Sequence, residues 1–255
     1  MSSEPAAITL AIDAGNSRVK WGWHDGGGWR SVASVSLIEF AASSREINPF
    51  AATREDPGRI IISNVAGDHT HQLIVKRTAI FGAAPLWLHG AAEQCGVRNR
   101  YEDPGALGPD RWAALIAARA LHEGSCLVVN AGTATTVDVL TGEGEFLGGL
   151  ILPGVELMRF ALHEHTGGLP LRRGRFRDTP RNTLDAIETG CRHAQAGAIE
   201  RMYRAMRGAA GGEPLCLVSG GAGKSLMELL PMRARYTENL VLEGLARIAL
   251  AGDGG

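Results

Sequence analysis

The sequence predicts an α/β protein of two duplicated lobes, each with a mixed sheet flanked by helices. One apolar run ends in Asp13-Ala14-Gly15-Asn16-Ser17, and a second ends in Asn130-Ala131-Gly132-Thr133. In both, an alternating strand resumes after the glycine, and helices then alternate with strands. We therefore expect an N-terminal lobe over residues 1–117 and a C-terminal lobe over residues 118–255.

In the N-terminal half, apolar and alternating runs predict strands, and runs with helical spacing predict helices. The expected strands are Ile8–Ile12, Val19–Trp23, Trp29–Val35, Arg59–Val65 and Pro85–His89. The expected helices are Leu37–Ser44, one around His71–Phe81, and Pro109–His122. The last of these is the clearest, because apolar residues repeat at helical spacing among alanines and Gly124 follows its end.

The C-terminal half repeats this plan. Its expected strands are Ser125–Asn130, Thr136–Leu140, Glu145–Leu152 and Leu215–Ser219. Its expected helices lie near Thr183–Met206 and Gly223–Leu230. Hairpin strands thus come first in both halves and are followed by helix–strand alternation.

Composition narrows the class of protein. A chain of 255 residues can bury one large core or two medium-sized cores, and its net charge of −1 favours neither nucleic acid nor an anionic membrane as partner. No apolar run reaches membrane-spanning length, and the four cysteines are scattered without metal-ligand spacing. We expect a cytoplasmic protein with reduced thiols.

The two glycine turns carry groups that suit a polyphosphate. A tight glycine turn directs backbone N–H groups and neighbouring hydroxyls toward one place, and the Asp13 carboxylate can hold Mg²⁺. The repeat of the turn predicts a nucleotide bound between the lobes.

The segment Tyr101–Arg111 carries the second set of candidate groups. Asp110 and Arg111 stand at the start of a predicted helix, where an acid commonly complements the helix dipole and an arginine is commonly solvated. Alongside a phosphate site they indicate a kinase for a small alcohol, which needs a carboxylate to take the hydroxyl proton and a cation to hold an acidic acceptor.

Three other motifs have simpler interpretations. Ser219–Ser225 is not a P-loop, since Val218 stands where that motif requires glycine. Its consecutive glycines suit either the close approach of a flat ligand such as adenine or its ribose, or a tight strand-to-helix turn. The two His-x-His pairs, at His69 and His163, have no third ligand nearby. The basic run Arg172–Arg177 is typical of a solvated loop.

These motifs, in this order, resemble those of the type III pantothenate kinases. The resemblance rests on Asp13-x-Gly15-Asn16-Ser17-x-x-Lys20, on Tyr101 with Gly108–Arg111, and on Gly132-Thr133-Ala134-x-Thr136. Further matches are Gly148-Gly149, Ile151-x-Pro153-Gly154, Asn182-Thr183, Ala186-Ile187 and Glu243-Gly244-Leu245. The family belongs to the acetate and sugar kinase–heat-shock protein 70–actin superfamily, so the resemblance implies actin-like, ribonuclease H-like lobes. The type III pantothenate kinase family also includes accessory-factor proteins.

The resemblance implies a function and a role for each matched residue. The function is ATP-dependent phosphorylation of pantothenate to 4'-phosphopantothenate, the first step of coenzyme A biosynthesis, with Asp110 as the catalytic base. The implied ATP phosphate ligands are Asp13, Ala14, Gly15, Asn16, Ser17, Arg18, Val19, Lys20 and Thr133, with Mg²⁺ at Asp13. The implied pantothenate ligands are Tyr101, Gly108, Pro109, Asp110, Arg111 and Thr183. A homodimer and a monovalent cation, K⁺ or NH₄⁺, are implied as well.

The chain departs from the family pattern at Asn130. The family has an aspartate here that is tied to the monovalent cation, and an amide offers a carbonyl oxygen without the charge. Two alternatives therefore stay open: a kinase for another small hydroxylated acceptor, and a non-catalytic accessory or regulatory protein on the same fold. The intact Asp13, Asp110 and Arg111 favour an enzyme.

Overall fold

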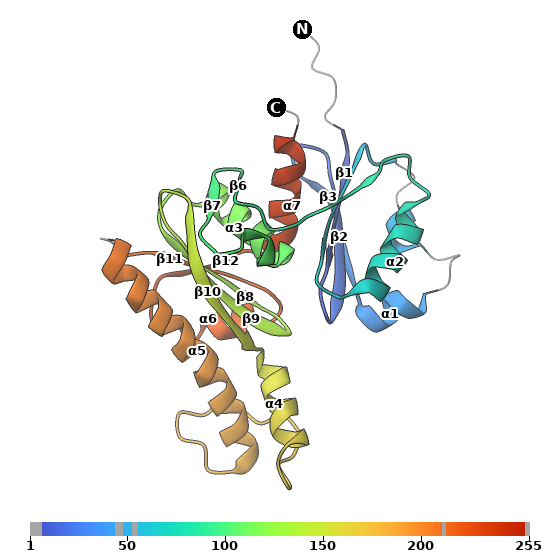
Figure 1. Ribbon diagram of the computed structural model, residues 1–255. Coiled ribbons are helices and arrows are strands. Elements are labelled where there is room, and N and C mark those ends of the chain that lie inside the picture. Colours follow the sequence, from blue (N-terminus) through green and yellow to red (C-terminus); the bar gives the residue numbers. More distant parts are fainter. Residues whose placement is uncertain (1–6, 44–47, 53–55, 211–212, 253–255) are drawn as a thin grey trace. The chain divides into compact units, whose positions relative to one another are not determined.

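The computed structural model describes residues 7–43, 48–52, 56–210 and 213–252. The chain divides into two compact units (Figure 1). Unit 1 comprises Met1–Ala120 together with Leu240–Gly255, and unit 2 comprises Leu121–Asn239. Ser44, the last residue of one predicted helix, lies outside the described residues.

Unit 1 is built on a five-stranded mixed sheet. Its strands, in spatial order, are β3 (Trp29–Ser36), β2 (Arg18–His24), β1 (Thr9–Ala14), β4 (Arg59–Asn64) and β5 (Pro85–Trp87). The pairs β3–β2 and β2–β1 are antiparallel, whereas β1–β4 and β4–β5 are parallel. This arrangement brings the carboxyl ends of β1 and β4 to the same edge of the sheet.

Helices cover both faces of this sheet. The helices of unit 1 are α1 (Leu37–Ala42), α2 (Asp68–Thr78), α3 (Pro109–Leu121) and α7 (Leu240–Ala251). The remaining elements are β6 (Glu93–Gln94), β7 (Val97–Asn99) and the 3₁₀ turns Pro49–Ala52 and Pro104–Ala106. On one face Phe40 of α1 and Ile74 of α2 join Trp21 and Trp23 in an apolar core. On the other, α7 packs on β1 and β4 (Figure 1).

The position of α7 differs from the predicted lobe boundary. Residues 240–252 were expected in the C-terminal lobe, but they belong to unit 1. A Cβ at Gly244 would lie 1.8 Å from the carbonyl oxygen of Ala113, so this contact with α3 requires glycine. The Arg59 guanidinium also donates to the carbonyl of Ala249 at 3.0 Å. Most residues of α7 are buried, and sequence analysis missed this helix.

Unit 2 repeats the sheet of unit 1. Its strands, in spatial order, are β10 (Glu145–Pro153), β9 (Ala134–Leu140), β8 (Cys126–Ala131), β11 (Leu215–Ser219) and β12 (Ala234–Tyr236). The first two pairs are antiparallel and the last two parallel, as in unit 1. The predicted duplication is therefore present in strand order and direction.

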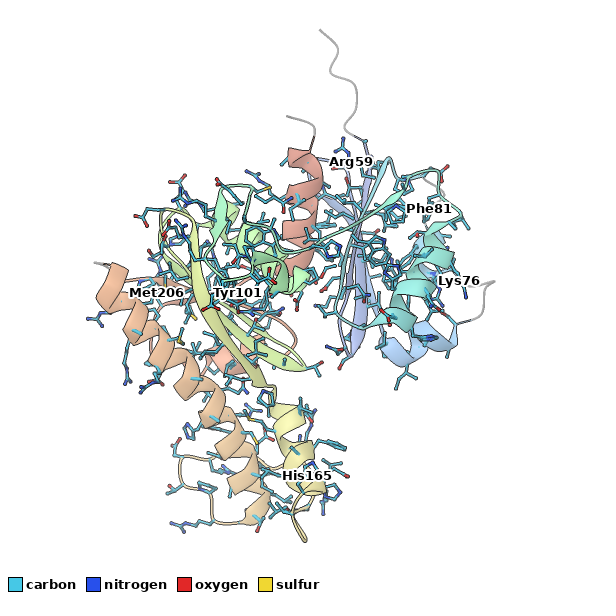
Figure 2. All side chains as sticks on the ribbon, viewed as in Figure 1. Arg59, Lys76, Phe81, Tyr101, His165 and Met206 are labelled. Atoms are coloured by element: carbon cyan, nitrogen blue, oxygen red, sulfur yellow. The ribbon has the colours of Figure 1, made fainter. Side chains whose placement is uncertain are left out.

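The helices of unit 2 are α4 (Val155–Glu164), α5 (Thr183–Ala210) and α6 (Gly223–Met227). Ile199, Tyr203 and Met206 of α5 pack on Val129 and Val137 of the sheet; Figure 2 labels Met206 near the end of this helix. Sequence analysis missed α4, and it missed the short strands β6, β7 and β12, which have too few residues to show a period. Within the described part of the chain, no helix is long and apolar enough to span a membrane.

One predicted helix is displaced by three residues at each end. It begins at Asp68 rather than His71 and ends at Thr78 rather than Phe81. Gly67 precedes it with a φ of 85°, a conformation that favours glycine, and Asp68 provides an acid in the first turn.

Candidate active site

The first glycine turn joins β1 to β2. The N–H of Gly15 donates to the carbonyl of Arg18 at 3.0 Å, which closes the turn. Asp13 lies just before it and is paired in register with Lys20 on β2. Since register partners project to the same face, the sheet holds a carboxylate and an ammonium side by side at its edge.

The other residues of this turn differ in whether their backbone or their side chains are accessible to a ligand. The side chains of Ala14 and Val19 are buried in the apolar core, so only their backbone groups could meet a ligand. The Arg18 guanidinium is exposed and donates to Ser34 Oγ at 2.8 Å. Asn16 and Ser17 are exposed.

The second glycine turn, in unit 2, is one residue shorter. Only Gly132 and Thr133 lie between β8 and β9, and the N–H of Gly132 donates to the carbonyl of Ala134 at 3.0 Å. The carbonyl of Thr133 accepts from the N–H of Gly154 at 2.8 Å. Asn130, at the end of β8, occupies the position that corresponds to Asp13 in the first turn.

Asp110 lies in the first turn of α3, immediately after Gly108 and Pro109. A Cβ at Gly108 would stand 2.8 Å from Asp110 Oδ1, so glycine leaves room for the carboxylate. Burial raises the pKa of Asp110, while hydrogen bonds from the backbone N–H groups of Arg111 and Asp110, together with the Arg111 charge, oppose that increase.

Asp110 lies close enough to Asp13 to affect the ionisation of the Asp13 carboxyl. Burial, followed by the neighbouring Asp110 carboxylate, raises the pKa of Asp13 to about 7, although Lys20 acts in the opposite direction. Unit 1 therefore holds a mutually repelling pair of carboxylates, one at a strand end and one at a helix start. Such a pair is typical of a functional site that binds a cation or moves a proton.

Arg111 and Tyr101 form the neighbouring part of the site. Arg111 is buried, with 5% of its surface exposed, and its Nη1 donates to the Tyr101 hydroxyl at 2.9 Å. Tyr101 is positioned in turn by Asn99, whose Oδ1 accepts from the Tyr101 N–H at 3.0 Å and whose Nδ2 donates to the Pro104 carbonyl at 3.2 Å. Sequence analysis missed Asn99, although an Asn two residues before Tyr101 is the signature of an Asx turn.

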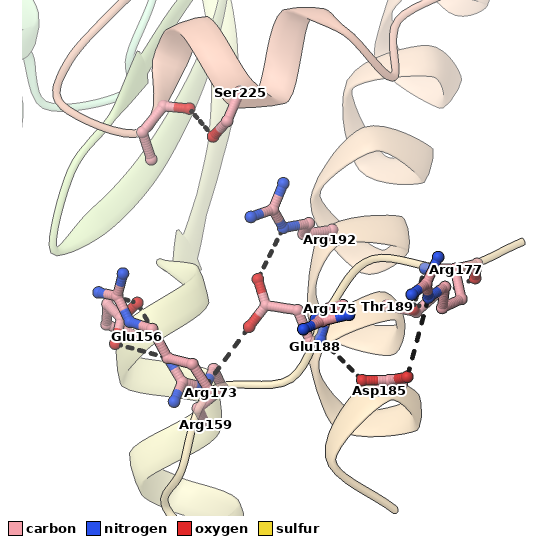
Figure 3. Close-up of polar contacts among 11 residues, drawn as sticks. Glu156, Arg159, Arg173, Arg175, Arg177, Asp185, Glu188, Thr189, Arg192 and Ser225 are labelled. Carbon is pink, nitrogen blue, oxygen red and sulfur yellow. Dashed lines mark hydrogen bonds and ion pairs between the residues drawn. The ribbon is translucent and has the colours of Figure 1, made fainter. Parts of the chain in front are cut away.

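Thr183 is exposed and is the first residue of α5 in unit 2. Asn182 caps this helix: its Oδ1 accepts from the Asp185 N–H and its Nδ2 donates to Asp185 Oδ2, each at 2.9 Å. Figure 3 shows how the preceding loop is attached by ion pairs. Arg173 pairs with Glu156 at 2.8 Å, and the N–H of Arg175 donates to Asp185 at 2.8 Å.

Arg159 of α4 also holds the loop that precedes α5. Only 4% of its side chain is exposed, and it pairs with Glu156 at 2.9 Å and with the buried Glu188 of α5 at 3.7 Å. Its Nη2 donates to the carbonyl of Leu171 at 2.7 Å. The basic run Arg172–Arg177 thus contributes partly to folding, since two of its members, Arg173 and Arg177, face acidic partners.

A dedicated metal cage is absent from the described residues, where no group of three or more His, Cys, Asp or Glu side chains could hold an ion. A site with only one or two carboxylates still suits Mg²⁺, because this ion commonly takes one or two protein carboxylates and completes its coordination shell with phosphates and water. The half-buried Asp13, close to Asp110, is a suitable carboxylate.

The fold and the acidic site together define the class of protein: an α/β protein with two units of the same strand order and a pair of carboxylates suited to binding a cation. The chain is similar to a solved structure named as a 2-dehydro-3-deoxygalactonokinase from Sinorhizobium meliloti, with a TM-score of 0.60 and 15% identity over 96% of this chain and 98% of that one. It is also similar to the ethanolamine utilization protein EutJ from Carboxydothermus hydrogenoformans, with a TM-score of 0.51 and 12% identity over 98% and 91% of the two chains. At these identities the likeness concerns the fold alone.

Sequence comparison places the chain within one family of this class. The family model described as type III pantothenate kinase matches residues 9–205. The type III pantothenate kinase of Aromatoleum aromaticum is 51% identical over 95% of this chain and 98% of its own length. That of Nitrosospira multiformis is 45% identical over 95% and 91%. The chain belongs to the type III pantothenate kinase family.

Proposed function

We propose that this chain transfers the γ-phosphoryl group of ATP to the primary hydroxyl of pantothenate, giving 4'-phosphopantothenate in the first step of coenzyme A biosynthesis. The observation that carries this proposal is the pairing of Asp13 with Asp110 beside the buried Arg111. Family membership supports it as well.

Asp110 is the proposed general base. Burial raises its pKa, which makes it a better proton acceptor than an exposed aspartate, while Arg111 and the backbone N–H groups keep it available in the ionised form. It would take the proton of the acceptor hydroxyl as the new P–O bond forms. The backbone of Gly108 and Pro109 would shape the space for that hydroxyl.

The acceptor's carboxylate is assigned to the Arg111–Tyr101 pair. A buried guanidinium held by a phenol hydroxyl at 2.9 Å is a preorganised anion site, because little side-chain entropy remains to be lost on binding. Thr183 at the start of α5 is a further proposed pantothenate contact.

The proposed phosphate ligands are the segment Asp13–Lys20 in unit 1 and Thr133 in unit 2. Lys20 would pair with a phosphate oxygen, and the N–H groups and hydroxyl of Gly15, Asn16 and Ser17 would donate to others. Mg²⁺, held by Asp13 and the nucleotide, would neutralise charge on the phosphates. We further propose a homodimer and a cytoplasmic location.

Replacing Tyr101 by Phe is expected to raise the KM for pantothenate by about 10-fold with kcat within about 3-fold of wild type. The change removes the hydroxyl that holds Arg111 and leaves the ring in place. Steady-state kinetics with saturating ATP would measure both constants. Tyr203→Phe, which removes a hydroxyl on α5 in unit 2, serves as the control. A fall in kcat with unchanged KM would contradict this role for Tyr101.

The monovalent cation is a finer part of the proposal and depends on Asn130. An amide oxygen attracts K⁺ less strongly than a carboxylate, so Asn130→Asp is expected to lower the K⁺ concentration for half-maximal activity by about 10-fold. The measurement is the initial rate against K⁺ concentration at constant ionic strength, with NH₄⁺ and Na⁺ in parallel. Identical cation profiles for the two proteins would remove Asn130 from the cation site.

The experiment that tests the proposed function is ADP release from ATP and Mg²⁺ with and without pantothenate. A panel of other small hydroxylated acids and sugars tests for a related kinase. We expect pantothenate to stimulate release more than any other acceptor. Preference for another acceptor would identify a different kinase, and no turnover by folded protein would favour the accessory or regulatory function.

A further inference from the structure

Ser63, on β4, is a buried hydroxyl with no partner. None of its surface is exposed, and its Oγ makes no hydrogen bond to any described residue. Burial of a hydroxyl without a hydrogen bond costs free energy, so such groups are rare in folded proteins and call for an explanation. One explanation is that the partner is formed only when a ligand is bound.

The register of the sheet places Ser63 beside Asp13. Asp13 is paired with Ser63 on β4 and with Lys20 on β2, so the three residues form one row across three adjacent strands. Register partners lie on the same face, with strands about 4.8 Å apart. The Asp13 carboxylate therefore has an ammonium on one side and an unused hydroxyl donor on the other.

A second unpartnered hydroxyl shows that position, rather than burial, sets Ser63 apart. Thr9 of β1 is also fully buried, and its Oγ1 also has no hydrogen-bond partner among the described residues. It lies on the same face of the sheet as Asp13, but at the opposite end of β1 and paired with Arg59. Thr9 thus provides a matched control.

We propose that Ser63 is a positioning residue for the nucleotide's metal ion: its hydroxyl donates to the Asp13 carboxylate when Asp13 holds Mg²⁺. This inference rests on the proposed function and extends it to a residue on a strand outside both glycine turns. Donation to one carboxylate oxygen fixes the rotation of the group and leaves the other oxygen for the cation. A hydrogen bond to an ionised carboxylate is among the stronger kinds.

The test compares Ser63→Ala with Thr9→Val in the full chain. Calorimetry would measure the Kd for ADP with Mg²⁺ and with EDTA, and thermal denaturation of ligand-free protein would measure Tm. We expect Ser63→Ala to raise the Kd for Mg·ADP by about 10-fold and to leave the Kd in EDTA unchanged. Its Tm should equal or exceed that of wild type, since it removes an unpaired polar atom. Thr9→Val should leave both Kd values unchanged.

Two further variants separate positioning from a structural role. Ser63→Cys keeps the size of the side chain and a weaker donor, and should give an intermediate Kd. In an Asp13→Asn background, Ser63→Ala should have no further effect on Mg·ADP binding, because the two residues act as a unit.

Each contrary result has a distinct meaning. Wild-type affinity of Ser63→Ala for Mg·ADP would overturn the role of Ser63 while leaving the proposed function intact. An equal loss with Mg²⁺ and with EDTA, or a loss accompanied by a lower Tm, would also overturn it, because the effect would then be structural. Failure of the wild-type protein to bind Mg·ADP would overturn the proposed function itself, and this inference with it.

Discussion

Asp110→Asn is expected to lower kcat by at least about 100-fold, the usual scale for loss of one general base. Asparagine keeps the shape of the side chain and fits the space beside Gly108, but it cannot accept the proton of the acceptor hydroxyl. The variant should stay folded and keep its KM for ATP, since the Asp13–Lys20 turn is unchanged. Steady-state kinetics together with a thermal denaturation curve would measure the effect.

Asp68→Asn is the matched control for this experiment. Asp68 also lies in the first turn of a helix, but it is exposed and belongs to α2. It removes the same charge without touching the site, so its kcat should stay within about 2-fold of wild type, as for an ordinary surface substitution. Turnover by Asp110→Asn comparable to that of this control would refute Asp110 as the base.

Asp13→Asn is expected to lower kcat/KM by at least about 100-fold and, at the same time, to stabilise the ligand-free protein at alkaline pH. The pKa of Asp13 in the folded protein is raised to about 7 from its ordinary value of 3.8. The folded state therefore binds this proton more tightly than the unfolded state. The stabilising contribution is complete below pH 4 and is lost as the pH rises through 7. Asparagine has no such loss.

The measurement is Tm against pH for both proteins, without Mg²⁺ or nucleotide. The difference should be small near pH 4 and reach about 4 °C or more in favour of Asp13→Asn at pH 8. Mg·ADP should reduce this difference, because a cation stabilises the ionised carboxylate of the wild type. A difference that does not change with pH would contradict the account of Asp13 as a destabilised, ligand-ready acid.

Much of the fold could be predicted because its signals are local. The hairpins at Gly15 and Gly132 follow from apolar runs that end in turn residues, and α3 follows from helical spacing and its flanking glycine. The helix α7 could not be assigned to its unit, because that depends on a backbone contact between Gly244 and Ala113 from distant parts of the chain.

The candidate site, like the fold, could be predicted only where its signals are local in the sequence. The turn residues and Asp110 could be selected by type and spacing, yet the ionisation of Asp13 depends on burial and on Asp110, nearly a hundred residues further along the chain. Ser63 could not be identified from the sequence, because only the parallel pairing of β4 with β1 brings it beside Asp13. Sequence analysis placed Arg111 and Tyr101 in the same candidate segment, but it did not predict the hydrogen bond between their side chains.

The most direct measurement is the mass of the product formed from pantothenate with ATP and Mg²⁺ in K⁺ buffer, compared between wild type and Asp110→Asn. We expect the wild type to add one phosphoryl group to pantothenate in step with ADP release, and Asp110→Asn to do so at least about 100-fold more slowly. ADP released without phosphorylated pantothenate, or equal product from both proteins, would contradict it.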